Sequence, residues 1–236
     1  MSLIKQITTS WDDGHPLDFR IADLLEKYNL KGTFYIPRTN TQNIVMAEDE
    51  ILSLSRRFEI GGHTLNHVDL RQCTSAQLRD EIKGCYDWLA DLTGRSPSSF
   101  CPPFGKYTKE ALEVIDQSGF KTVRTTVLLS PHNTLPVTDT TMQVYNHSAY
   151  TYTKHLLIRN KWSDLRLWLG SGATVDAFKL ANYYLDYIEK YGGCFHLWGH
   201  SWEIEKFGLW NQLEALFSIL AERKQFSYVE NKDIKG

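Results

Sequence analysis

The sequence predicts an α/β protein in which parallel strands are joined by helices, and it favours a barrel over an open sheet. Short apolar and β-branched runs alternate with segments of helical hydrophobic spacing along the whole chain, which is typical of strands connected by helices. Candidate active residues also stand at the carboxyl ends of several predicted strands: Asp12, His63, Phe104 and His200. This placement is expected of barrel enzymes, although strand ends also host ligands in open sheets.

The first half of the chain carries the more regular pattern. Strands are predicted over residues 4–11, 32–37, 58–63, 98–102 and 121–127, and helices over residues 17–29, 47–57, 74–92 and 109–118. The helix at 74–92 is the most clearly amphipathic, and Thr74 and Gln77 match a capping box at its start.

The second half is less regular. Strands are predicted over residues 142–150, 193–200 and 226–229, helices over residues 154–169, 175–191 and 208–220, and a loop over residues 131–141. No linker, low-complexity run or internal repeat interrupts the alternation. We therefore expect a single catalytic domain over residues 1–236.

Composition limits the class of partner. A formal net charge of -2 gives no electrostatic reason to expect binding to nucleic acid or to an anionic membrane. No apolar run is long enough to span a bilayer. The four cysteines, without paired spacing, and the absence of a signal-peptide pattern predict a cytoplasmic protein; a secreted protein trimmed of its signal is the alternative. The oligomeric state stays open.

Two adjacent carboxylates, Asp12 and Asp13, follow the first predicted strand and precede Gly14. Side chains alternate between the faces of a strand, but at a strand end the loop can turn both acids toward one pocket. Two acids this close repel each other when both are charged, so a positive group is expected nearby. The alternative is an ordinary turn, because Asp-Asp-Gly is a common turn composition.

His63 and His67 are four residues apart, a spacing that places both imidazoles on one side of a helical turn. Thr64 stands where a zincin has glutamate, so that mechanism is rejected. Two histidines and one aspartate would suit a divalent ion such as zinc with an open position for water, and the second aspartate could accept the proton of that water. Two surface histidines in a loop are the alternative.

These residues resemble the motifs of the polysaccharide deacetylases with NodB homology, carbohydrate esterase family four. The first family motif, Thr-Phe-Asp-Asp-Gly, corresponds to the stretch from Thr9 to Gly14, and the second, His-Ser/Thr-x-x-His, to His63 and His67. The resemblance extends from Asp12 to about His200. It implies a distorted (β/α) barrel of about seven strands.

The resemblance also implies a ligand set and a reaction. Asp13, His63 and His67 would bind one divalent metal ion, with zinc expected and cobalt or nickel as alternatives. Asp12 would be the general base in the removal of an acetyl group from an N-acetylated sugar by metal-activated water. A backbone N–H in the third motif, at Phe104 here, would stabilise the tetrahedral oxyanion.

The third motif departs from the family pattern. The family has Arg-Pro-Pro-Tyr-Gly, whereas this chain has Cys101 at the arginine position and Phe104 at the tyrosine position. A thiol cannot replace the fixed, always-charged fork of arginine that orients the base. Arg124, on the next predicted strand, is the candidate replacement, and a surface arginine is the alternative reading.

The last family motif is an apolar strand that ends in a histidine, the general acid for the leaving amine. Here His196 and His200 both fit, and we prefer His200 because it stands nearer the strand end. Glu203 would orient His200 or would be a surface acid. Trp198 and Trp202 are candidates for stacking on a sugar, with at most one expected to do so.

The sequence therefore predicts a metal-dependent hydrolase of carbon–nitrogen bonds other than peptide bonds, acting on an N-acetylated sugar. The first alternative is a hydrolase of a small non-sugar amide or cyclic imide. The second is a non-catalytic carbohydrate-binding protein, suggested by the missing arginine at Cys101.

Overall fold

A curled parallel sheet forms the centre of the computed structural model, which describes residues 3–236; Met1 and Ser2 of the predicted domain lie outside the described residues. Within that range the sheet has nine strands, in the order β6-β5-β4-β3-β2-β1-β8-β7, with β9 also paired to β1. They are β1 (Lys5–Asp12), β2 (Thr33–Ile36), β3 (Glu59–Gly62), β4 (Ser99–Phe100), β5 (Thr122–Arg124), β6 (Val137–Thr138), β7 (Met142–Gln143), β8 (Gly193–Gly199) and β9 (Ser227–Tyr228). The predicted distorted barrel is confirmed, with more strands than the seven expected.

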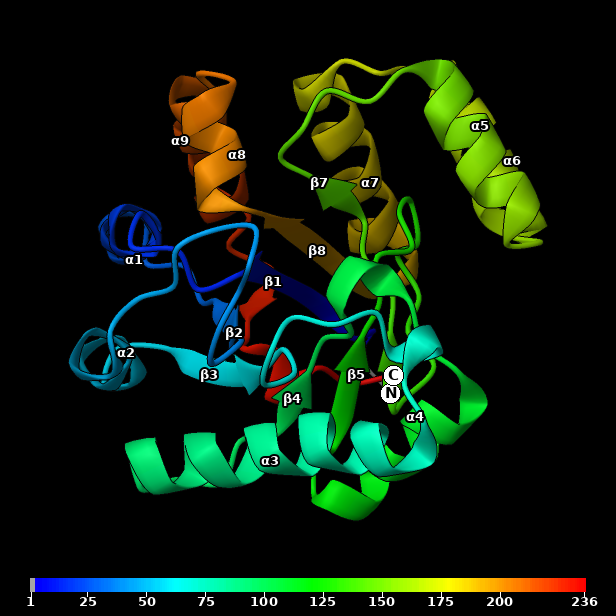
Figure 1. The fold of residues 1–236 in the computed structure, drawn as a ribbon. Coiled ribbons are helices and arrows are strands. Elements are labelled where there is room, and N and C mark those ends of the chain that lie inside the picture. Colours follow the sequence, from blue (N-terminus) through cyan, green and yellow to red (C-terminus); the bar gives the residue numbers. More distant parts are fainter. Residues whose placement is uncertain (1–2) are drawn as a thin grey trace.

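Helices cover the outside of the curled sheet (Figure 1). They are α1 (Asp18–Lys27), α2 (Glu48–Ser55), α3 (Ser75–Thr93), α4 (Lys109–Ser118), α5 (Ala149–Ile158), α6 (Trp162–Gly170), α7 (Ala177–Tyr191), α8 (Ser201–Lys206) and α9 (Trp210–Ala221), with short 3-10 turns at Leu70–Gln72, Pro103–Gly105 and Asn231–Asp233. Among the described residues, no helix combines the length and the apolar character that crossing a membrane requires.

Strand β1 shows how the alternation of a strand divides the barrel wall from its interior. Trp11 faces outward, where its ring meets Phe217 of α9 edge-on at 5.9 Å. The even-numbered residues face inward and carry polar groups. Ser10 Oγ lies 2.9 Å from His196 Nε2 of β8, and Asp12, at the strand end, contacts Arg124 of β5. A column of polar contacts therefore runs up the barrel interior to the carboxyl ends of the strands.

The second half of the chain contains most of the errors in the predicted elements. The strand expected over 142–150 has only two residues, because Ser148 accepts a hydrogen bond from the Thr151 N–H and caps α5 there. The helix expected over 154–169 is two helices, separated where Asn160 takes a φ of 54°. The loop expected over 131–141 contains β6, and the strand expected over 98–102 covers only Ser99–Phe100. Helix α8 was not predicted.

Candidate active site

The two carboxylates at the end of β1, Asp12 and Asp13, point into the same site because the chain turns sharply at Asp13. Asp13 has a φ of 80°, which breaks the alternation of the strand, and aspartate tolerates this region better than most residues. Gly14 continues the turn with a φ of 61°, and a Cβ there would stand 2.6 Å from Ile36 Cγ2. Both carboxylates are buried, with Asp12 at 3% and Asp13 at 4% exposure. The acidic pair is therefore part of a constrained site.

Asp13, His63 and His67 bring their ligand atoms within 4.8 Å of one another. Asp13 Oδ1 lies 3.6 Å from His63 Nε2 and 3.0 Å from His67 Nε2. His67 reaches this position with a φ of 51°, and Thr64, between the two histidines, has a φ of 64°. Non-glycine residues with such values are costly and gather at functional sites.

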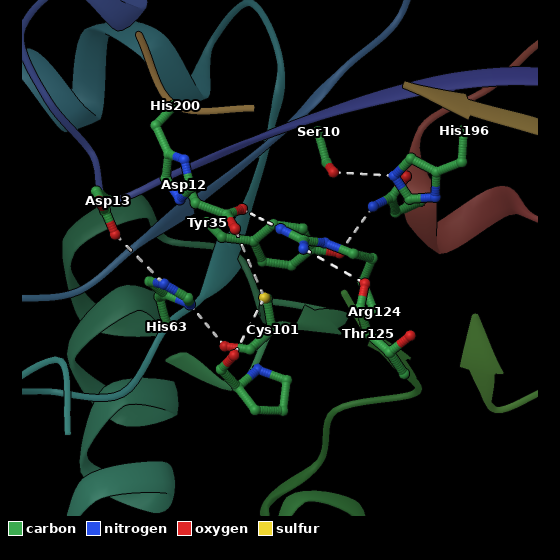
Figure 2. A network of polar contacts seen from close by, with 12 residues as sticks. Ser10, Asp12, Asp13, Tyr35, His63, Cys101, Arg124, Thr125, His196 and His200 are labelled. Atoms are coloured by element: carbon green, nitrogen blue, oxygen red, sulfur yellow. Dashed lines mark hydrogen bonds and ion pairs between the residues drawn. The ribbon is translucent and has the colours of Figure 1, made fainter. Parts of the chain in front are cut away.

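The hydrogen bonds of His63 suit a cation at this cluster. Its Nδ1 lies 2.6 Å from the carbonyl oxygen of Cys101, which only accepts, so Nδ1 carries the proton and donates (Figure 2). In a neutral ring, Nε2 then presents a lone pair toward the Asp13 carboxylate, and two acceptors at this distance need a cation or a proton between them. The donor set of two imidazoles and one carboxylate matches the ligands that zinc takes.

The pKa values of this cluster reflect the same demand for positive charge. Burial opposes ionisation of Asp13, but hydrogen bonds with His63 and His67 outweigh it and hold the pKa of Asp13 well below its usual value. Burial also opposes the charge on His63, yet Cys101 and the hydrogen bond with Asp13 raise its pKa well above its usual value. A divalent cation at this cluster would supply the positive charge that the buried Asp13 carboxylate requires.

Asp12 has its own positive partner, the guanidinium of Arg124, to which it is ion-paired (Figure 2). Arg124 is fully buried, and its charged group lies 5.1 Å from the ring centre of Tyr35 and 4.7 Å from that of Trp198. Two aromatic faces compensate part of the lost hydration of a buried cation. Cys101 Sγ is 3.9 Å from Asp12 Oδ2, so the thiol touches the carboxylate without supplying charge.

Gly61, two residues before His63, makes room for this arrangement. It lies within β3. A Cβ on Gly61 would stand 2.6 Å from the Tyr35 ring. The missing side chain therefore lets Tyr35 lie against Arg124.

Of the two candidate histidines, only His200 lines the same cleft as the acidic pair and the Asp13–His63–His67 cluster, which is called the reactive cleft below. Its Nδ1 donates to Glu203 Oε2 at 3.0 Å, which leaves Nε2 for a ligand. Glu203 is itself fixed by Gln143 of β7, whose amide donates to the same oxygen at 3.1 Å. His196 is fully buried beside Ser10, and burial together with the charge of Arg124 lowers its pKa well below the usual value.

Replacing Glu203 by glutamine is expected to move the alkaline limb of the kcat–pH profile to lower pH. Burial lowers the pKa of His200, but the hydrogen bond with Glu203 and then the charges of Asp13 and Asp12 raise it above its usual value. Without the Glu203 charge the pKa falls, so a general acid at His200 loses its proton at lower pH. Glu205→Gln, on the same helix but outside the cleft, is the control. An unshifted limb in Glu203→Gln would contradict this role.

The cluster, the acidic pair and His200 line one cleft of about 420 Å³ at the carboxyl ends of the strands. A larger hollow of about 900 Å³ lies beside β9 and the start of β1, at the other end of the barrel, and contains no such cluster. The candidate active site is therefore identified by the side chains that line the cleft and not by the volume of the cleft.

The aromatic candidates have different surroundings. Phe104 is 44% exposed at the cleft, has a φ of 60°, and its ring centre lies 4.8 Å from that of His67. Trp202 donates its indole N–H to Asp13 Oδ2 at 2.8 Å. Trp198 is 5% exposed against Arg124, so little of its ring is left for a sugar.

Several contributors were not singled out from the sequence, namely Tyr35, Gln143 and the contact of Trp202 with Asp13. Of these three, Tyr35 alone carries a usable signal, because it lies two residues before Pro37, where a predicted strand ends. Gln143 and Trp202 belong to no sequence motif that predicts these contacts, and only the folding of the chain brings them to the site.

The fold and this cluster define a barrel protein with a candidate metal site and a charge-paired carboxylate at its strand ends. The sequence profile of the polysaccharide deacetylase family matches residues 3–123, and the chain belongs to that family. It is 27% identical over 124 residues to a peptidoglycan-N-acetylglucosamine deacetylase of Bacillus cereus, a match that covers 52% of this chain and 44% of that protein. The chain thus spans less than half the length of that relative.

Solved structures share the fold. The Xyl-CE4 domain of a multidomain xylanase from the hindgut metagenome of Trinervitermes trinervoides aligns with a TM-score of 0.58 and 14% identity, covering 96% of this chain and 87% of that one. A CE4 family pseudoenzyme from Bacillus anthracis aligns with a TM-score of 0.55 and 15% identity, covering 96% and 63%. Because this fold carries both an enzyme-associated domain and a pseudoenzyme, the argument for function depends on the site.

Proposed function

We propose that this chain removes the acetyl group from N-acetylated sugar units of a polysaccharide, with a divalent metal ion as cofactor. The observation that carries the proposal is the pairing of Asp12 with Arg124 beside the Asp13–His63–His67 cluster. The same cleft is lined by Asp12, by the Asp13–His63–His67 cluster and by the hydrogen-bonded pair of His200 and Glu203. The family membership and a peptidoglycan deacetylase among the relatives support sugar acetamides as the substrate.

Asp13, His63 and His67 would hold the metal ion. When bound, it supplies Lewis acidity toward the acetamide carbonyl and toward water, and zinc is the proposed ion. The hydrogen bond from His63 Nδ1 to the Cys101 carbonyl fixes the tautomer that a ligating Nε2 needs. The Trp202 indole orients the second oxygen of Asp13.

The proton steps belong to this chain's own side chains. Asp12 accepts the proton of the attacking water, and its ion pair with Arg124 holds the carboxylate in place for that step. His200 gives a proton to the departing amine nitrogen as the carbon–nitrogen bond breaks, and Glu203 holds the ring for that transfer. Acetate and a free amino sugar are the products. The Phe104 N–H is the proposed donor to the oxyanion.

Acetate release from N-acetylglucosamine oligomers and from peptidoglycan fragments tests the proposal. The protein is treated with a chelator and then reloaded with zinc, cobalt or nickel. Release that stops on chelation and returns with metal is the expected result, and Asp12→Asn should remain inactive throughout. Binding of oligomers without acetate release would favour the carbohydrate-binding alternative, and hydrolysis confined to small amides or cyclic imides would favour the other.

A further inference from the structure

A second hollow, of about 360 Å³, adjoins the reactive cleft. The two share three lining residues, Phe104, Thr126 and Arg159, so a molecule in the cleft can extend into the second hollow. Gly105 packs so tightly on Thr126 that a Cβ there would stand 1.9 Å from its hydroxyl oxygen. The shared wall is thus closely built from the turn that carries Phe104.

The charges that line this second hollow are all positive. They are those of Arg71, Lys106 and Arg159, and no carboxylate is among its lining residues. Asp69 compensates two of them, with contacts of 2.9 Å to Arg71 and 3.5 Å to Lys106. Arg159 has no carboxylate within 4.0 Å among residues 3–236. An excess of positive charge therefore borders the site in a chain whose formal net charge is -2.

The neighbour of Arg159 leaves its guanidinium without an acceptor. Arg159 Nη1 lies 3.3 Å from His155 Nδ1, but the Leu128 N–H donates to Nε2 of the same ring at 3.0 Å. Burial, with the charge of Arg159, lowers the pKa of His155 to about 4, so the ring is neutral at pH 7. A neutral ring that accepts at Nε2 carries its proton on Nδ1, and a guanidinium only donates. The donors of Arg159 are thus left for water or a ligand.

We propose that the second hollow binds an anionic group, a carboxylate or a phosphate, of the same molecule whose acetamide occupies the reactive cleft. Arg159, at the boundary of the two hollows, would form the paired hydrogen bonds that such oxygen anions accept from a guanidinium. The substrate class is then an acidic N-acetylated glycan rather than a neutral one. This inference rests on the proposed deacetylase function.

The test compares Arg159→Gln with Lys154→Gln. Lys154 is an exposed cation on α5, the helix that ends just before Arg159, and it lines neither hollow. Three substrates are used: a neutral N-acetylglucosamine oligosaccharide, the same oligosaccharide carrying a uronic acid, and the same oligosaccharide carrying a phosphate ester. Arg159→Gln should raise KM about tenfold, or about 1.4 kcal/mol, on a charged substrate and leave the neutral one unchanged. Lys154→Gln should change neither. The substrate with the larger effect identifies the anion.

An equal change on charged and neutral substrates, or none on either charged substrate, would overturn the anion site. Added salt should raise KM for the charged substrate in the parent protein more than in Arg159→Gln. If no oligosaccharide releases acetate, the proposed function fails, and calorimetric titration of the charged oligosaccharides decides the anion site separately. Binding that Arg159→Gln weakens about tenfold or more would support the anion site, whereas equal binding by both proteins, or no binding, would overturn it.

Discussion

Replacing Arg124 by methionine is expected to lower kcat by about 10²-fold and to destabilise the protein by about 3 to 5 kcal/mol. The substitution keeps an apolar stem between Tyr35 and Trp198 but removes the cation that is paired with Asp12. A buried carboxylate without its partner takes up a proton or draws in water, and either outcome removes an oriented base. Turnover measured together with denaturant unfolding checks both effects.

Measuring the metal content shows whether Arg124→Met loses turnover through Asp12 or through a disturbed Asp13–His63–His67 cluster. Arg124 contacts none of Asp13, His63 and His67, so Arg124→Met should bind the same amount of zinc as the parent protein. Arg124→Lys keeps the charge without the planar fork and should recover stability more than turnover. Unchanged turnover in Arg124→Met would show that Asp12 needs no charge partner, and the assignment of Arg124 would then fail.

The fold follows from the sequence where local pattern and tertiary packing agree. From β1 to α4, apolar spacing and caps such as Thr74 place every major helix and strand. After residue 130, β6, β7 and β9 have only two residues each and are held by neighbouring strands; β7, for example, pairs with β8 at Met142 and Gln143. Two residues carry no readable periodicity, so this half could not be predicted in detail.

In the candidate site, too, one part could be predicted from the sequence and another part could not. Its ligand and base candidates are readable because Asp12, Asp13, His63 and His67 stand in short motifs at predicted strand ends. The arrangement of their partners is not readable from motifs. Arg124 meets Asp12 across 112 positions of sequence, and Gln143 reaches Glu203 across 60. Such contacts arise from the curl of the sheet, which brings β5, β7 and β8 around β1.

Replacing His67 by alanine is expected to abolish stable metal binding and with it nearly all turnover. Removing one of the three proposed ligands should cost more than the roughly 10–100-fold in affinity that follows loss of a group that merely orients a ligand. Trp202→Phe provides that comparison within the same cluster, because it deletes the hydrogen bond to Asp13 Oδ2 and leaves all three proposed ligands in place. Metal analysis and zinc titration of the purified variants measure both effects without depending on activity.

The decisive result is the order of zinc affinity among the parent protein and these two variants. If Asp13, His63 and His67 form the ligand set, zinc affinity should fall in the order parent protein, Trp202→Phe, His67→Ala. Asp12→Asn, the matched change at the neighbouring carboxylate, should retain its metal while losing turnover, since Asp12 is paired with Arg124 rather than with the cluster. Full zinc binding by His67→Ala would refute the ligand set. Loss of zinc in Asp12→Asn would mean instead that the metal lies between Asp12, His63 and Cys101, the second group of residues here whose ligand atoms converge.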